Sequence, residues 1–123
     1  MKFSHVTIHA KAFEKSVAFY RDIVGLPIAR TVPADAPLEK ARIAFMGDGE
    51  TVVELIRQAA PAEPVVAVNI TIGFLVPGDI AAWKAELAAG GFEIIEPETL
   101  PPNVIFFYIK DPDGVLVQFY RYR

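Results

Sequence analysis

Glu54 has the strongest case for chemistry in this sequence, because its carboxylate stands between apolar neighbours. The run from Val52 to Ile56 reads as a strand, and its alternation puts Val52 and Ile56 on the same face as Glu54. Burying an ionised carboxylate without a partner is costly. Glu54 is therefore either exposed on a solvated sheet face or placed for metal binding or proton transfer. Its expected partner is His5.

The first predicted strand, residues 3–10, carries both histidines of the chain. Alternation places His5, Thr7 and His9 on one face and apolar side chains on the other. A single histidine in a strand is more often a hydrogen-bonded core or surface residue, but His5 here has polar company. We expect His9 to contact a substrate rather than to bind a metal.

Gln118 repeats the pattern of Glu54 in the second half of the chain, between Leu116 and Tyr120. A neutral amide tolerates burial, so Gln118 either coordinates a metal weakly through its oxygen or makes a cross-strand hydrogen bond. Thr71 stands where a counterpart of His5 is expected. Threonine is rarely a ligand of transition ions, so we expect Thr71 to contact a substrate instead. The glycine-rich turns lack the spacing of a phosphate-binding loop, and no Ser-His-Asp order can be argued.

The elements that position these residues occur twice in the order strand, helix, strand, strand, strand. The first set is predicted at strand 3–10, helix 12–24 and strands 28–31, 41–45 and 51–57. The second is predicted at strand 68–76, a helix capped by Asp79, and strands 92–95, 105–110 and 115–122. An offset of 66 residues aligns Val6 with Ile72 and Gly25 with Gly91, which indicates a weak internal duplication. We therefore predict a first module over residues 1–60, a linker over 61–67 and a second module over 68–123.

The predicted fold class is α+β, with two paired βαβββ modules that form a curved mixed sheet around a concave cleft. The helix of each module covers one sheet face and leaves the other to a partner module or a ligand. Five aromatic residues crowd the last predicted hairpin, namely Phe106, Phe107, Tyr108, Phe119 and Tyr120. Alternation sends some of them to the cleft, so we expect a ligand with an apolar or aromatic portion and a substrate contact from Tyr120. The alternative is that all five pack in the core.

The composition restricts the class of protein. The chain has 123 residues, no cysteine, 53% hydrophobic residues and a formal net charge of -3. These values fit one compact domain and exclude intrinsic disorder, disulfides and thiolate zinc sites. No basic stripe favours nucleic acid as a partner. The longest apolar tract, residues 65–76, is shorter than the roughly 20 residues of a membrane span, and the N-terminus does not read as a secretory signal. We expect a soluble, cytoplasmic protein that does not bind membranes.

Several of these segments together resemble one family, the vicinal oxygen chelate superfamily. They are His5-Val6, the helix segment 14–20, Gly25-Leu26, the strand segment 53–56, and the turn 111–114 followed four positions later by Gln118. This superfamily contains glyoxalase I, methylmalonyl-CoA epimerase, extradiol dioxygenases, and fosfomycin and bleomycin resistance proteins. The resemblance covers nearly the whole chain and implies paired βαβββ modules, usually in a homodimer. It also implies a divalent metal held by the first and last strands of each module.

Carried over residue by residue, the resemblance makes His5 and Glu54 metal ligands of the first module. The second module departs from the pattern, because Thr71 replaces a histidine, Gln118 replaces a glutamate and Val115 replaces a common asparagine. A site of His5, Glu54, Gln118 and water is chemically feasible, and it would hold zinc, nickel or manganese weakly. Extradiol dioxygenase chemistry is disfavoured, because it requires two histidines and one carboxylate.

Two functions follow from the resemblance. The preferred one is metal-assisted lyase or isomerase chemistry through an enediolate, in which Glu54 moves the proton. The alternative is a metal-free protein that binds or sequesters a ligand, similar to bleomycin resistance proteins, and the departures at Thr71 and Gln118 favour it. The expected partners are a small molecule and a second copy of the chain in a homodimer. The sequence names no substrate and leaves open whether the modules pair within one chain or between two.

Overall fold

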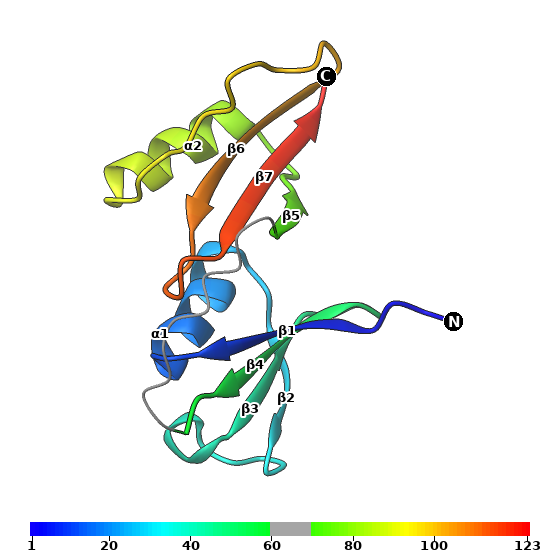
Figure 1. The fold of residues 1–123 in the computed structure, drawn as a ribbon, viewed down its shortest axis with the longest axis vertical. Helices are drawn as coiled ribbons and strands as arrows, with labels where there is room; N and C mark the ends of the chain where they lie inside the picture. The colour runs from blue at the N-terminus through cyan, green and yellow to red at the C-terminus, as the bar shows by residue number, and fades with distance from the viewer. Residues whose placement is uncertain (60–69) are drawn as a thin grey trace. The chain divides into compact units, whose positions relative to one another are not determined.

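The computed structural model describes residues 1–59 and 70–123. The chain divides into two compact units, Met1–Val65 and Val66–Arg123, and each has its own sheet (Figure 1). The predicted linker, residues 61–67, and the first residues of the predicted strand 68–76 lie outside the described residues. Within those described ranges, no helix has the length and apolar character needed to cross a membrane.

The first unit is built on a mixed sheet with the strand order β1-β4-β3-β2. Its strands are β1 (His5–Ala10), β2 (Ile28–Val32), β3 (Ile43–Met46) and β4 (Val52–Arg57). Strand β1 pairs in parallel with β4, and the other neighbours pair antiparallel. The four predicted strands are confirmed with shifts of one or two residues at most ends. The parallel pair brings the first and last strands of the unit side by side, although they are far apart in the sequence.

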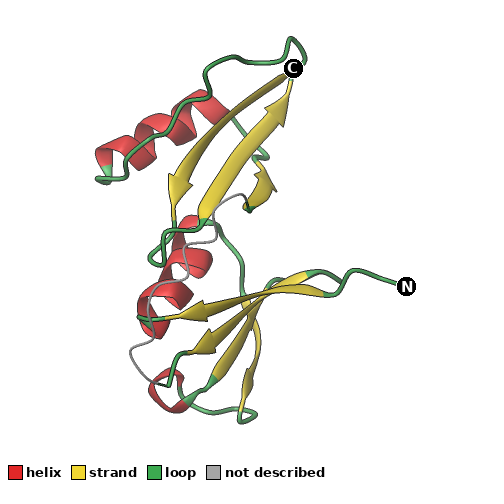
Figure 2. Ribbon diagram, in the orientation of Figure 1, coloured by secondary structure: helices red, strands yellow, loops and turns green. Residues whose placement is uncertain are grey.

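The predicted helix 12–24 consists of two parts, α1 (Phe13–Ala18) and the π-helical turn η1 (Phe19–Ile23), shown as helix in Figure 2. Phe13, Val17 and Tyr20 are buried as expected. In the wider turn, the amide of Val24 donates to the carbonyl of Phe19, so Val24 is only half-buried. Gly25 ends the helix at a φ of +86°, a conformation that glycine adopts without strain.

The second unit has the strand order β5-β7-β6, with β5 (Thr71–Leu75) parallel to β7 (Leu116–Tyr122) and β6 (Val104–Lys110) antiparallel to it. The predicted cap is confirmed, because the Asp79 carboxylate accepts from the amides at the start of α2 (Ile80–Ala89), at 2.8 and 3.2 Å. Gly91, with a φ of +90°, follows the helix, and the Phe92 amide donates to the Leu87 carbonyl.

The predicted strand 92–95 was wrong in extent, since only Ile95 forms a bridge, with Tyr108. The amide of Phe92 is already used to end α2. Pro97 follows two residues after Ile95 and has no amide hydrogen to extend the ladder. The α+β class and the βαβββ-like repeat are confirmed, and the strands form two mixed sheets in place of one. The predicted cleft stays a prediction.

One face of each sheet forms the core of its unit. In the first unit the buried face of the sheet contacts α1, and its side chains are Ile8, Ala10, Ala44, Met46, Val53 and Leu55. In the second unit the buried face contacts α2, and its side chains are Phe107, Ile109, Val117 and Phe119. The opposite faces carry half-buried and exposed side chains, except that Phe45 on the first sheet is buried. We call these the first open face and the second open face.

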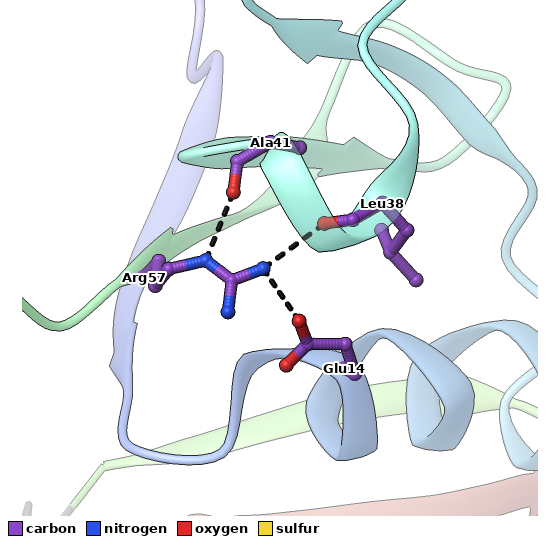
Figure 3. A network of polar contacts seen from close by, with 4 residues as sticks. All are labelled: Glu14, Leu38, Ala41 and Arg57. Atoms are coloured by element: carbon purple, nitrogen blue, oxygen red, sulfur yellow. Dashed lines mark hydrogen bonds and ion pairs between the residues drawn. The ribbon is translucent and has the colours of Figure 1, made fainter.

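Arg57 ties the end of β4 to two other segments (Figure 3). Its Nε donates to the Ala41 carbonyl at 2.9 Å, and one terminal nitrogen donates to the Leu38 carbonyl at 3.0 Å and to Glu14 Oε1 at 2.7 Å. The guanidinium also lies over the Phe13 ring, 4.4 Å from its centroid. This one side chain therefore joins the sheet, α1 and the 3-10 turn η2 (Leu38–Lys40).

The pH dependence of stability should reveal this ion pair. The hydrogen bond from Arg57 lowers the pKa of Glu14. A carboxylate with a depressed pKa stabilises the fold above the pKa of the unfolded chain, about 4.3, and the effect is lost as the pH falls through the folded pKa. The Glu14→Gln variant should therefore be less stable than wild type at pH 7, by under about 1 kcal/mol because Glu14 is exposed. In urea titrations the difference should shrink as the pH falls below about 4.3, and a constant difference would contradict the assignment.

Candidate functional site

Glu54 lies at the centre of the first open face. The strand register aligns Thr7 of β1, Glu54 of β4, Phe45 of β3 and Arg30 of β2 in one row across the sheet. The side chain of Glu54 is 13% exposed, so its carboxylate is largely withdrawn from solvent yet still reachable. Its strand neighbours on this face, Val52 and Ile56, are half-buried.

The two oxygens of Glu54 have different surroundings. Oε1 accepts a hydrogen bond from Thr7 Oγ1 at 3.0 Å. Oε2 lies 4.0 Å from Nε2 of His5, which is too long for a hydrogen bond. The other ring nitrogen of His5, Nδ1, lies 3.2 Å from Ser4 Oγ. When the ring proton is on Nδ1, Nδ1 donates it to Ser4 Oγ, and Nε2, the nitrogen nearer Glu54, carries the lone pair.

His5 Nε2 and Glu54 Oε2 lie slightly further apart than two ligands of one ion do. Metal bonds of about 2.0 to 2.2 Å place neighbouring ligand atoms roughly 3 to 3.5 Å apart, slightly closer than His5 Nε2 and Glu54 Oε2. In residues 1–59 and 70–123, no three His, Cys, Asp or Glu side chains gather as a metal-binding group. A complete site would need other donors. Gln118 belongs to the second unit, so the predicted set of three ligands stays a prediction.

Two residues of this face were missed from the sequence as parts of the site. Thr7 was placed on the correct face, but its bond to Glu54 depends on the parallel register of β1 and β4. Arg30 reaches the row of Glu54 through an irregularity in β2 between Ile28 and Arg30. The predicted substrate contact His9 lies exposed on the same face, in register with Ile56.

The second open face places Gln118 in the position that matches Glu54. Its Nε2 donates to the hydroxyl of Tyr108 at 3.4 Å, which is the cross-strand hydrogen bond considered as its structural role. Its register partner on β5 is Gly73, where an added Cβ would lie 3.2 Å from Gln118 Oε1. Glycine therefore leaves room for the amide oxygen. Thr71 is exposed two residues earlier on the same strand face.

The aromatic residues of the last hairpin divide between the two sheet faces. Phe107 and Phe119 are buried against each other, with their centroids 5.6 Å apart. Phe106, Tyr108 and Tyr120 are half-buried on the second open face. Core packing of all five is therefore wrong, and this face combines aromatic rings with the Gln118 amide. Strands β5, β6 and β7 carry no histidine and no carboxylate.

Comparison with known proteins extends over almost the whole chain. Residues 2–119 match the family model of the Glyoxalase/Bleomycin resistance protein/Dioxygenase superfamily. The protein YwbC of Bacillus subtilis is 30% identical over 123 residues, which cover 98% of this chain and 97% of that protein. A lactoylglutathione lyase of Haemophilus influenzae is 26% identical over 97% of this chain and 91% of its own. The structure of TnmS3, an antibiotic binding protein from Streptomyces sp. CB03234, is similar with a TM-score of 0.70 at 19% identity, covering 100% of this chain and 97% of that one.

Proposed function

Because the chain belongs to the glyoxalase/bleomycin resistance protein/dioxygenase superfamily, we propose that it is a lyase or isomerase that moves a proton on a small molecule with two adjacent oxygens. The observation that carries the proposal is the asymmetry of the Glu54 carboxylate. One oxygen is held by Thr7, and the other faces the Nε2 atom of His5. A lactoylglutathione lyase among the relatives supports the same class of chemistry.

In the proposed reaction, Glu54 is the general base. Its carboxylate takes a proton from the carbon beside the substrate carbonyl and returns a proton to the adjacent carbon. The bond from Thr7 fixes the carboxylate, so that Oε2 rather than Oε1 is presented. A divalent ion, when bound, supplies the Lewis acidity that stabilises negative charge on the substrate oxygens. The exposed His9 would contact the substrate on the same face.

The residues that would hold the ion, whether zinc, nickel or manganese, are His5, Glu54 and Gln118. Two ligands alone hold an ion poorly, so the amide oxygen of Gln118 supplies the third. Glu54→Ala should abolish binding of the ion. Gln118→Ala should weaken binding of the ion at least about tenfold. Removing only a hydrogen-bond partner of a metal ligand already costs about that much affinity, and Gln118 is proposed as a ligand itself.

Elemental analysis and calorimetric titration with each metal chloride, on wild type and both variants, measure this prediction. Glu50→Ala is the matched control, because Glu50 is an exposed glutamate paired with Lys2. Wild type should bind one ion per chain and lose it to a chelator. Wild type that binds no ion after incubation with any of the three metals would contradict the proposed site.

A second candidate function is metal-free ligand binding, and the second open face favours it. That face presents Phe106, Tyr108 and Tyr120 where a ligand ring could stack. In the second unit, Thr71 and Gln118 stand at the positions that correspond to His5 and Glu54. The same fold serves the antibiotic binding protein from Streptomyces. Under either function the partner is a small molecule with an apolar portion, and a homodimer stays part of the proposal.

A further inference from the structure

Arg30 is a cation on the first open face whose charge the proposed reaction does not use. Its guanidinium carbon lies 3.7 Å from the centroid of the Phe45 ring. Phe45 is in register with Glu54, so Arg30 and Glu54 occupy the same row on either side of this ring. None of the ion pairs among the described residues involves Arg30, whereas Arg21 and Arg57 each pair with a carboxylate.

The contact with Phe45 fixes Arg30 without using its hydrogen-bond donors. A guanidinium that stacks on an aromatic ring uses its flat face, and its N–H groups point outward in the plane. The ring also restricts the side chain before a ligand arrives, so less conformational entropy is lost on binding. A planar fork of free donors matches the two oxygens of a carboxylate. The Arg30 guanidinium is thus preorganised to bind an anion.

The position of Arg30 also determines which part of a ligand it meets. Strand β3 separates β2 from β4, so the backbones of Arg30 and Glu54 are about 10 Å apart. The Glu54 carboxylate would repel an anionic group of the ligand placed next to it. The same anionic group placed toward β2, two strands away, would meet the Arg30 guanidinium instead. A ligand that meets both side chains must reach from Glu54 to the guanidinium that lies over the Phe45 ring.

We propose that Arg30 binds a carboxylate at the end of the ligand remote from Glu54. The ligand class is a small organic acid that carries adjacent oxygens at one end and a carboxylate at the other. This assignment rests on the proposed function, which puts the adjacent oxygens at Glu54. It makes Arg30 a residue that determines specificity, and its effect should appear only with charged ligands.

A pair of compounds that differ in one charge tests the assignment. The probes are 4-(hydroxyacetyl)benzoate and its neutral amide, 4-(hydroxyacetyl)benzamide, in which a rigid ring separates an α-hydroxyketone from the variable group. Dissociation constants are measured by NMR titration of the full chain as wild type, Arg30→Gln and Arg21→Gln. The last variant is the control, because Arg21 is an exposed arginine of η1 paired with Asp22.

Wild type should bind the benzoate about tenfold more tightly than the benzamide, as one charge-assisted contact predicts. Arg30→Gln should weaken the benzoate about tenfold and leave the benzamide within about twofold, whereas Arg21→Gln should keep the wild-type preference. Equal binding of both probes by wild type, binding of neither, or the same loss in Arg21→Gln would overturn the assignment.

Exchange of the hydroxymethyl protons with deuterium separates this proposal from the proposed function. If wild type prefers the benzoate but exchanges no protons, the anion site at Arg30 stands and the proposed enzyme activity is contradicted. If both probes bind equally well and exchange at rates that Arg30→Gln does not alter, the proposed enzyme activity stands and the anion site at Arg30 is excluded.

Discussion

Glu54→Gln is expected to slow proton exchange at the carbon beside the carbonyl of an α-hydroxyketone by about 10²- to 10⁴-fold, the usual contribution of a general base. The amide keeps the size of the side chain and an oxygen that can accept from Thr7, but it cannot take up a proton. The second unit already holds an amide, Gln118, at the matching position, so the substitution suits this kind of sheet. The fold should therefore survive while the reaction is lost.

The rate is measured in deuterium oxide with 2-hydroxyacetophenone as the probe, and thermal unfolding of each variant reports on the fold. Glu50→Gln provides the control, because it removes an exposed carboxylate from the loop before β4. It should exchange at the wild-type rate. Exchange by Glu54→Gln at the rate of wild type would show that another group moves the proton.

Arg57→Met is expected to lower the free energy of unfolding by about 2 to 4 kcal/mol. Methionine retains much of the apolar stem, but the carbonyls of Ala41 and Leu38 lose their donor, and Ala41 is fully buried. An unpaired buried carbonyl retains the cost of its lost hydration. The ion pair with Glu14 adds little, because both side chains are partly exposed.

Urea unfolding at pH 7 measures this loss. Arg21→Met is the control, since within residues 1–59 and 70–123 the Arg21 side chain bonds only to the neighbouring Asp22. Its stability should change by less than about 0.5 kcal/mol. Arg57→Lys should fall between wild type and Arg57→Met, because an ammonium cannot reproduce the planar set of donors. A loss in Arg57→Met no larger than that of the control would show that water replaces the network.

Local patterns predicted much of the fold. Alternation identified the strands and their buried faces, and Asp79 marked the start of α2. The π-helical turn at Phe19–Ile23 was not predicted, because one extra residue in a turn barely changes the spacing of the apolar side chains. The segment 92–95 failed for another reason. Its apolar residues are typical of a strand. The Phe92 amide is used at the end of α2 and Pro97 has no amide hydrogen, so only Ile95 bridges to Tyr108.

The candidate site was predictable to the extent that it depends on one strand at a time. Glu54 stood out among apolar neighbours, and alternation put Thr7 and His5 on one face. Which of them lies beside Glu54 depends on the register between strands about 47 residues apart, and no local period encodes that register. Arg30 depends on both the register and the irregularity in β2, so it could be recognised only in the folded sheet.

Metal-dependent proton exchange by wild type decides between an enzyme and a ligand-binding protein. The chain is treated with a chelator, dialysed, and assayed in deuterium oxide with 2-hydroxyacetophenone while zinc, nickel or manganese is added in steps. Exchange should stop without the ion and return in proportion to the ion bound, up to one per chain. A wild-type chain that binds the compound but exchanges no proton at any metal concentration would contradict the enzyme and leave a ligand-binding protein.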